Sequence, residues 1–122
     1  MRDNTRVLVI DDEFSILNAL KLILEDNGYG VVTASTGREG IKHFQEQHFN
    51  ITITDYCLPD MTGLDVIHQI CQIQPGCSVI LITAYASPET ILETVKCGST
   101  GFLIKPFEPS NIINLIEETL QS

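Results

Sequence analysis

Short apolar runs rich in β-branched residues recur along the chain and alternate with longer segments in which apolar residues return every three or four positions. The first pattern is typical of buried β-strands, and the second is typical of amphipathic α-helices. The alternation predicts five strand-helix units. The predicted strands are residues 7–10, 31–34, 51–54, 78–83 and 101–104.

The first and last helical segments each carry one apolar stripe, which must face a sheet. Residues typical of helix ends stand where the periodicity starts or stops. Gly28 follows the first helix, Gly98 ends the fourth, and Pro109, whose fixed φ suits a first turn, begins the fifth. The stripes predicted to be buried are Ile16, Leu17, Leu20 and Leu24 in the first helix, and Ile112, Ile113, Ile116 and Leu120 in the last.

Nearly unbroken apolar strands that alternate with helices predict a parallel sheet covered on both faces. The expected fold class is α/β, a doubly wound five-stranded parallel sheet in a flavodoxin-like three-layer sandwich, (βα)5. Only Ser35, Thr36 and Gly37 follow the second strand, which suits a sheet edge, so we expect strand order 2-1-3-4-5. The length is that of one domain, residues 1–122.

Reactive side chains stand at the ends of the other four strands. Asp11 and Asp12 follow the first strand, Asp55 ends the third, Thr83 ends the fourth and Lys105 follows the fifth. In open parallel sheets the functional crevice lies beyond the carboxyl ends of the strands. We therefore expect these five side chains to meet there.

Three carboxylates at one edge of a sheet repel one another, so the site must take up protons or a cation. Oxygen-only ligands suit a hard divalent ion, Mg²⁺ or Mn²⁺, which keeps water ligands and binds phosphate oxygens. Lys105 and Thr83 could hold further phosphoryl oxygens, and a carboxylate can be the nucleophile in phosphoryl transfer. Asp55 is placed for that role.

The composition limits the kinds of partner and ligand that the chain can bind. The 16 acidic and 7 basic residues give a net charge of −9, which argues against nucleic-acid binding. Neither a membrane-spanning run nor a signal-peptide core is present, so we expect a cytoplasmic protein without a membrane partner. Cys57, Cys71, Cys77 and Cys97 show no CxxC or Cys/His ligand spacing, which favours reduced thiols over disulfides or zinc.

Four motifs at the predicted strand ends carry a family resemblance: VLVIDDE, ITITDYCLPDMTG, VILITAYAS and GFLIKPF. In this order and spacing they resemble the receiver domain of two-component response regulators, over essentially the whole chain. LITAYAS and GFLIKPF are most similar to receivers of enhancer-binding transcription activators. The resemblance implies a bacterial signalling protein that catalyses only its own phosphorylation and dephosphorylation, and is not otherwise an enzyme.

The resemblance also implies roles for individual residues. Asp12 would bind Mg²⁺ directly and Asp11 largely through water, while Asp55 would be both a metal ligand and the phosphoacceptor. The backbone carbonyl of Cys57 would complete the metal site. Thr83 and Lys105 would bind the phosphoryl oxygens. The Lys105 to Pro106 peptide bond is expected to be cis, as is usual in the family.

The resemblance also implies that phosphorylation signals by changing one surface of the domain. In the family the phosphoryl group draws the threonine inward, here Thr83, and an aromatic on the fifth strand, here Phe102, turns into the vacated space. The switch changes the face formed by the fourth helix, fifth strand and fifth helix. The implied partners are a sensor histidine kinase or phosphotransfer protein, and a second copy of the chain in a phosphorylation-dependent homodimer through this face.

The chain departs from the family pattern at several positions. Phe102 lacks the hydroxyl of the tyrosine found in many relatives, so any switching there rests on packing. Cys57 and Tyr85 occupy positions that border the attacking water, and a bulky phenol there predicts a longer phosphoryl lifetime than in fast-cycling chemotaxis-type relatives. Gly101 replaces an acidic residue often found before the aromatic.

Three alternatives stay open on the residues alone. A haloacid dehalogenase-type phosphatase would place its nucleophile after the first strand in a DxDxT frame, which is absent here. A flavodoxin-like FMN binder would need a Ser/Thr/Gly-rich phosphate loop where this chain has carboxylates. A pseudo-receiver would serve only as an interaction module. The chain could also be a stand-alone regulator or the N-terminal part of a longer one.

Overall fold

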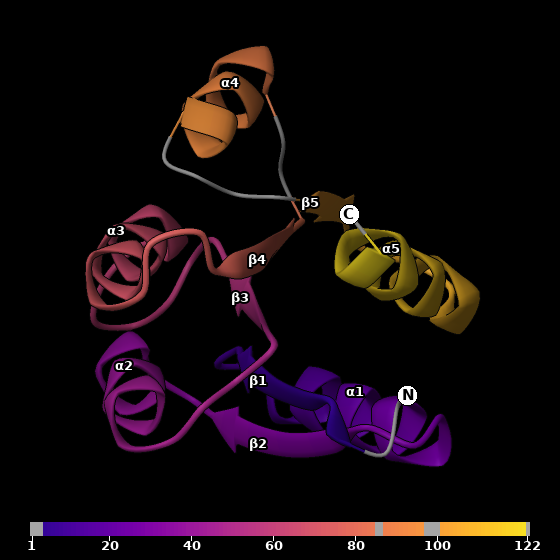
Figure 1. The fold of residues 1–122 in the computed structure, drawn as a ribbon. Coiled ribbons are helices and arrows are strands. Elements are labelled where there is room, and N and C mark those ends of the chain that lie inside the picture. The colour runs from indigo at the N-terminus through magenta and orange to yellow at the C-terminus, as the bar shows by residue number, and fades with distance from the viewer. Residues whose placement is uncertain (1–3, 85–86, 97–100, 122) are drawn as a thin grey trace.

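One parallel sheet of five strands runs through the centre of the computed structural model, which describes residues 4–84, 87–96 and 101–121. The strand order is β2-β1-β3-β4-β5, so the predicted fold class and order are confirmed (Figure 1). The strands are β1 (Arg6–Ile10), β2 (Gly30–Ala34), β3 (Ile51–Asp55), β4 (Ser78–Thr83) and β5 (Gly101–Ile104).

Four helices connect the five strands, a fifth follows β5, and together the helices cover the sheet. In Figure 1, α1 and α5 lie on one side of the sheet and α2 and α3 on the other, while α4 lies toward its β4–β5 end. Their bounds are α1 (Phe14–Asp26), α2 (Gly37–Glu46), α3 (Gly63–Ile73), α4 (Pro88–Lys96) and α5 (Pro109–Gln121). The fifth helix thus begins at the predicted proline, whereas Gly98 lies outside the described residues.

Alternate residues of each central strand supply two separate apolar cores. Val7 and Val9 of β1 pack with the buried residues of α1 and α5, whereas Leu8 and Ile10 pack with those of α2 and α3. All four side chains are fully buried. The strand-edge prediction for β2 also holds, because most of its residues are only half-buried. Burial on both faces explains the absence of polar alternation in β1 and β4.

The predicted helical stripes are mostly buried. Leu17, Leu20 and Leu24 face the sheet from α1, and Ile112 and Ile116 face it from α5. Ile16 and Ile113 pack at the margin of this core, half-buried. Leu120 departs from the prediction, because it is 37% exposed near the end of α5. Within the described ranges, no helix is long and apolar enough to cross a membrane.

The loop from β3 to α3 is held at several points. The Asp60 carboxylate accepts hydrogen bonds from the backbone N–H groups of Gly37 and Arg38, at 2.8 and 2.9 Å, at the start of α2. Thr62 and Asp65 form a reciprocal capping box at the start of α3. These bonds fix the chain that follows Asp55, the last residue of β3.

Gly63 is where this loop approaches the sheet most closely. Its N–H donates to the Tyr56 carbonyl at 2.6 Å. A Cβ at this position would lie 2.5 Å from the Asp55 carbonyl oxygen and 2.9 Å from the Tyr56 Cα. Both are backbone atoms, which cannot move aside as the end of a flexible side chain could. Only glycine therefore fits here without displacing the end of β3.

We predict that Gly63→Ala lowers the free energy of unfolding by about 1–3 kcal/mol through overpacking. Gly30→Ala is the matched control, because a Cβ on Gly30 would meet its nearest atom, in the Arg6 side chain, at 3.7 Å. Urea denaturation of the parent and both variants measures the difference. Equal stabilities for the two variants would contradict the steric argument.

Candidate functional site

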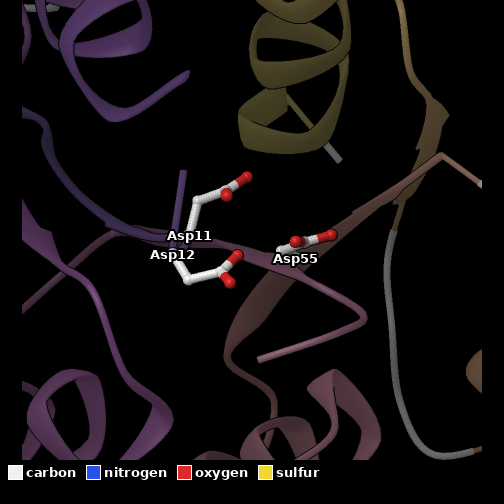
Figure 2. Close-up of side chains that lie close together, drawn as sticks. All are labelled: Asp11, Asp12 and Asp55. Atoms are coloured by element: carbon white, nitrogen blue, oxygen red, sulfur yellow. The ribbon is translucent and has the colours of Figure 1, made fainter. Parts of the chain in front are cut away.

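Three carboxylates converge at the carboxyl edge of the sheet. Asp11 and Asp12 follow β1, and Asp55 ends β3, the neighbouring strand (Figure 2). One carboxylate oxygen from each residue lies within 4.8 Å of the others. Asp11 and Asp55 are buried, whereas Asp12 is exposed. The fold thus brings together the three acidic residues predicted from the strand ends.

A pocket of about 250 Å³ opens at this edge of the sheet. Its walls come from the segments that follow β1, β3, β4 and β5, so all the predicted reactive side chains except Asp11 line it directly. Thr83, at the end of β4, is only 2% exposed, and Cys57 is exposed at the opening. The lining residues are Asp12, Glu13, Asp55, Cys57, Thr83, Ala84 and Lys105.

Lys105 joins the carboxylates through its ammonium group. Its Nζ lies 2.9 Å from Asp11 Oδ2 and 3.5 Å from Asp55 Oδ2. The Lys105 backbone N–H donates to the Thr83 carbonyl at 2.7 Å, which links β5 to the end of β4. The Lys105 to Pro106 peptide bond is cis, as the resemblance implied.

Glu13 is a site residue for which the sequence predicted no role. Its Oε1 accepts a hydrogen bond from Lys105 Nζ at 3.1 Å, and its side chain lines the pocket. The signal was present in the sequence, because Glu13 is the third acid of the run Asp11-Asp12-Glu13. Only the fold shows that this acid shares the lysine with Asp11.

The electrostatics reflect burial of like charges. Burial, and then the nearby Asp11 charge, raise the pKa of Asp55 from 3.8 to about 6. Burial also raises the pKa of Asp11. Burial alone would lower the pKa of Lys105, but its bonds to Asp11 and Glu13 outweigh this and raise it. The ammonium therefore stays charged, and at neutral pH most Asp55 carboxyls are ionised beside it.

The donor set fits a hard divalent cation. Asp11, Asp12 and Asp55 offer oxygen ligands close enough to share one ion. Burial raises the pKa of both buried acids and Lys105 opposes this only in part, so a further cation would favour their ionised forms. Cys57 lines the same pocket. The acidic cluster is therefore a fitting metal site.

The two residues predicted to act in the switch lie at different depths. Thr83 is buried at the pocket wall, whereas Phe102 is half-buried on β5 and packs against the core shared with α2 and α3. Phe102 pairs in register with Leu81, two residues before Thr83 on β4. Tyr85 lies outside the described residues.

Comparison with known families agrees with this geometry. Residues 7–117 match the model of the response regulator receiver domain. The chain belongs to this family. Receiver domains are signalling domains of two-component systems that are phosphorylated on an aspartate, and they are not conventional enzymes. The resemblance and the function inferred from the four motifs are thereby confirmed.

Individual relatives point to transcription regulators and to activated receivers. The chain is 34% identical over 118 residues to the transcriptional regulatory protein ZraR of Escherichia coli K12, covering 97% of this chain but 27% of ZraR. It is 38% identical to the NtrC4 receiver domain, solved as a beryllofluoride-activated dimer, with a TM-score of 0.90 and coverage of 95% and 96% of the two chains.

A third relative was solved with ligands. It is a response regulator from Burkholderia pseudomallei whose structure holds a phosphorylated aspartic acid, a calcium ion and citrate. The identity is 30% and the TM-score 0.85, and the match covers 97% of this chain and 72% of that one. A receiver of this family thus carries both a phosphoaspartate and a divalent cation.

The raised pKa of Asp55 predicts a pH-dependent stability. Between its ordinary value of 3.8 and about 6, the folded state binds more protons at Asp55 than the unfolded state, so stability falls as pH rises. Asp55→Asn removes the ionisable group and therefore this loss of stability. In chelator, we expect the variant to exceed the parent by about 1–3 kcal/mol in free energy of unfolding near pH 7.5, and by less near pH 4.5.

Asp60→Asn is the matched control with the opposite sign. Slight burial tends to raise the pKa of the Asp60 carboxyl, but hydrogen bonds from the Arg38 and Gly37 N–H groups outweigh this effect and lower the pKa. The stability that Asp60 contributes is therefore present at neutral pH and lost as pH falls, so Asp60→Asn should be the less stable protein near neutral pH. If the difference in free energy of unfolding between the parent and Asp55→Asn were the same at both pH values, the raised pKa of Asp55 would be contradicted.

Proposed function

We propose that Asp55 of this chain accepts a phosphoryl group from a phosphohistidine on a sensor histidine kinase or phosphotransfer protein. The observation that carries the proposal is the position of Asp55: a buried carboxylate that lines the pocket, 3.5 Å from Lys105 and within 4.8 Å of the Asp11 and Asp12 ligand atoms. With a pKa of about 6, Asp55 is mostly ionised at neutral pH and so a competent nucleophile.

The reaction is a displacement at phosphorus. An Asp55 carboxylate oxygen forms the new P–O bond while the P–N bond to the histidine breaks, and the departing imidazole keeps the electron pair. Thr83 and Lys105 each hold one phosphoryl oxygen, the first through its hydroxyl and the second through its ammonium. Lys105 has three N–H donors, so it can bind a phosphoryl oxygen while it keeps its contact with Asp11.

The metal in this proposal is Mg²⁺, with Mn²⁺ as a substitute. Asp12 and Asp55 would hold it directly, Asp11 largely through water, and the Cys57 backbone carbonyl would complete the protein ligands. A bound divalent cation would offset the carboxylate charge and bind a phosphoryl oxygen. The support is the acidic cluster itself and the calcium ion in the Burkholderia pseudomallei relative.

The output surface in this proposal is the face of α4, β5 and α5. Exposed apolar side chains gather on these elements: Leu92 is 56% exposed, Val95 61% and Ile104 49%. Phosphorylation would shift Thr83 and Phe102 and so the packing of this face, on which a second phosphorylated copy docks. The NtrC4 receiver, solved as an activated dimer, supports this assembly.

We further propose that residues 1–122 are one receiver domain acting in the cytoplasm, and that any transcription-regulating output belongs to the protein of which it is part. The chain spans about a quarter of the length of ZraR, 27%. The phosphatase alternative would need Asp11 as nucleophile, but that side chain is fully buried. The FMN alternative would place a phosphate against the acidic pocket.

Incubation with acetyl phosphate tests the phosphoacceptor. We expect the intact mass of the parent to rise by one phosphoryl group with Mg²⁺, and to stay unchanged with chelator or in Asp55→Asn. Asp60→Asn, a nearby exposed acid outside the pocket, should be modified as the parent is. A folded parent without any adduct would favour the interaction-module alternative, and a phosphorylated Asp55→Asn would place the phosphoacceptor elsewhere.

Sedimentation with beryllofluoride, a phosphoryl mimic, tests the dimer. With Mg²⁺ and beryllofluoride we expect the parent to dimerise, and Leu92→Glu to weaken the dimer by roughly tenfold or more because it places charge on an apolar interface. Leu22→Glu is the control, since Leu22 is equally apolar, 69% exposed, and lies on α1, which is not one of the three elements of that face. Dimerisation that is insensitive to Leu92→Glu would exclude this face.

A further inference from the structure

Two thiols touch where α3 meets β4. Cys71 lies in the last turn of α3, and Cys77 directly precedes β4. Their sulfur atoms are 3.5 Å apart and share a hydrogen bond. This contact lies at the amino edge of the sheet, opposite the pocket of Asp55, so it takes no part in the phosphoryl chemistry. Spacing along the sequence gave no sign of it, because the pair is not a CxxC motif.

The two sulfurs have different surroundings. Cys77 is 7% exposed and belongs to the core shared with α2 and α3, whereas Cys71 is half-buried at its margin. Burial, together with the hydrogen bond to Cys71, raises the pKa of the Cys77 thiol to about 12. Cys77 therefore keeps its proton near neutral pH, and Cys71 is the sulfur that a dissolved oxidant reaches first.

The connection between the two cysteines has room to adjust. Gly76 adopts a φ of +81°, and a Cβ built there would meet no atom within 4 Å. The Cys77 N–H donates to the Gln74 carbonyl at 3.2 Å, which closes a tight turn directly after α3. A disulfide needs the sulfurs to approach to about 2.05 Å. Side-chain rotation and a small shift of this open turn can provide the difference.

We propose that Cys71 and Cys77 are a reversible redox pair that a hydroperoxide converts to an intramolecular disulfide. The Cys71 thiolate attacks a peroxide oxygen, the O–O bond breaks, and the departing oxygen takes up a proton and leaves as water or an alcohol. Cys71 is then a sulfenic acid. The Cys77 sulfur attacks the Cys71 sulfur, its thiol proton goes to the displaced hydroxide, and water leaves.

The balance is two thiols and one hydroperoxide giving one disulfide, one water and one water or alcohol. The thiols lose two electrons and the peroxide gains them. A dithiol reductant reverses the change. The disulfide would link the end of α3 to the start of β4. Its formation depends on the contact between the two thiols and not on the proposed phosphorylation.

Hydrogen peroxide on the full chain, followed by intact mass analysis, tests the proposal. We expect the parent to lose the mass of two hydrogen atoms and to regain it with dithiothreitol. Free thiols are then blocked, the disulfide is reduced, and a second alkylating reagent labels the released thiols. That label should appear at Cys71 and Cys77, and at neither Cys57 nor Cys97.

Matched variants complete the test. Cys57→Ser, at the exposed thiol beside the pocket, should show the same loss of two hydrogen atoms. Cys71→Ser, at the margin of the core, should not, and Cys77→Ala provides a second variant of the pair. Labels at Cys57 or Cys97, a disulfide between two chains, or stepwise addition of oxygen without a disulfide would each overturn the proposal.

Discussion

Burial of like charges at the carboxyl edge of the sheet is the constraint on which the site depends. Asp11 is fully buried and Asp55 is 6% exposed, at the carboxyl ends of the neighbouring strands β1 and β3, and Lys105 contacts both. Burial is the main cause of the raised pKa values of both acids, the nearby Asp11 charge adds to it at Asp55, and the one Lys105 ammonium opposes the rise only in part. The two apolar cores on either side of β1 and β3 stabilise the strands strongly enough to hold these acids in place.

The same imbalance prepares the site for its ligands. A fully neutralised cluster would have little affinity for a cation, whereas carboxylates that lack sufficient positive partners gain from one. The loop that follows Asp55 is fixed by Asp60, by the Thr62 cap and by the close approach of Gly63. Rigid support around an electrostatically unfavourable centre is a recurring property of functional sites, where local stability is lower than the fold could provide.

The fold and most of the site could be predicted because each rests on a short-range pattern. Strand and helix periodicity specified the sheet, and the residue at each strand end specified Asp11, Asp12, Asp55, Thr83 and Lys105. What could not be predicted depends on contacts between elements. The Glu13 to Lys105 bond and the Cys71 to Cys77 contact join separate parts of the chain, and Leu120 follows the stripe of α5 but is exposed near its end.

The weak anchoring of α4 connects the site to the proposed output face. Thr94 is the buried residue of this helix, and its apolar Leu92 and Val95 face solvent, so α4 has little buried apolar surface to fix its position. Elements of low local stability are the ones that small perturbations displace. Thr83 ends β4, the strand that precedes α4, so a phosphoryl group that moved Thr83 would act on the least anchored helix first. A modest change in the pocket could thus alter the α4, β5 and α5 face while the two cores stay intact.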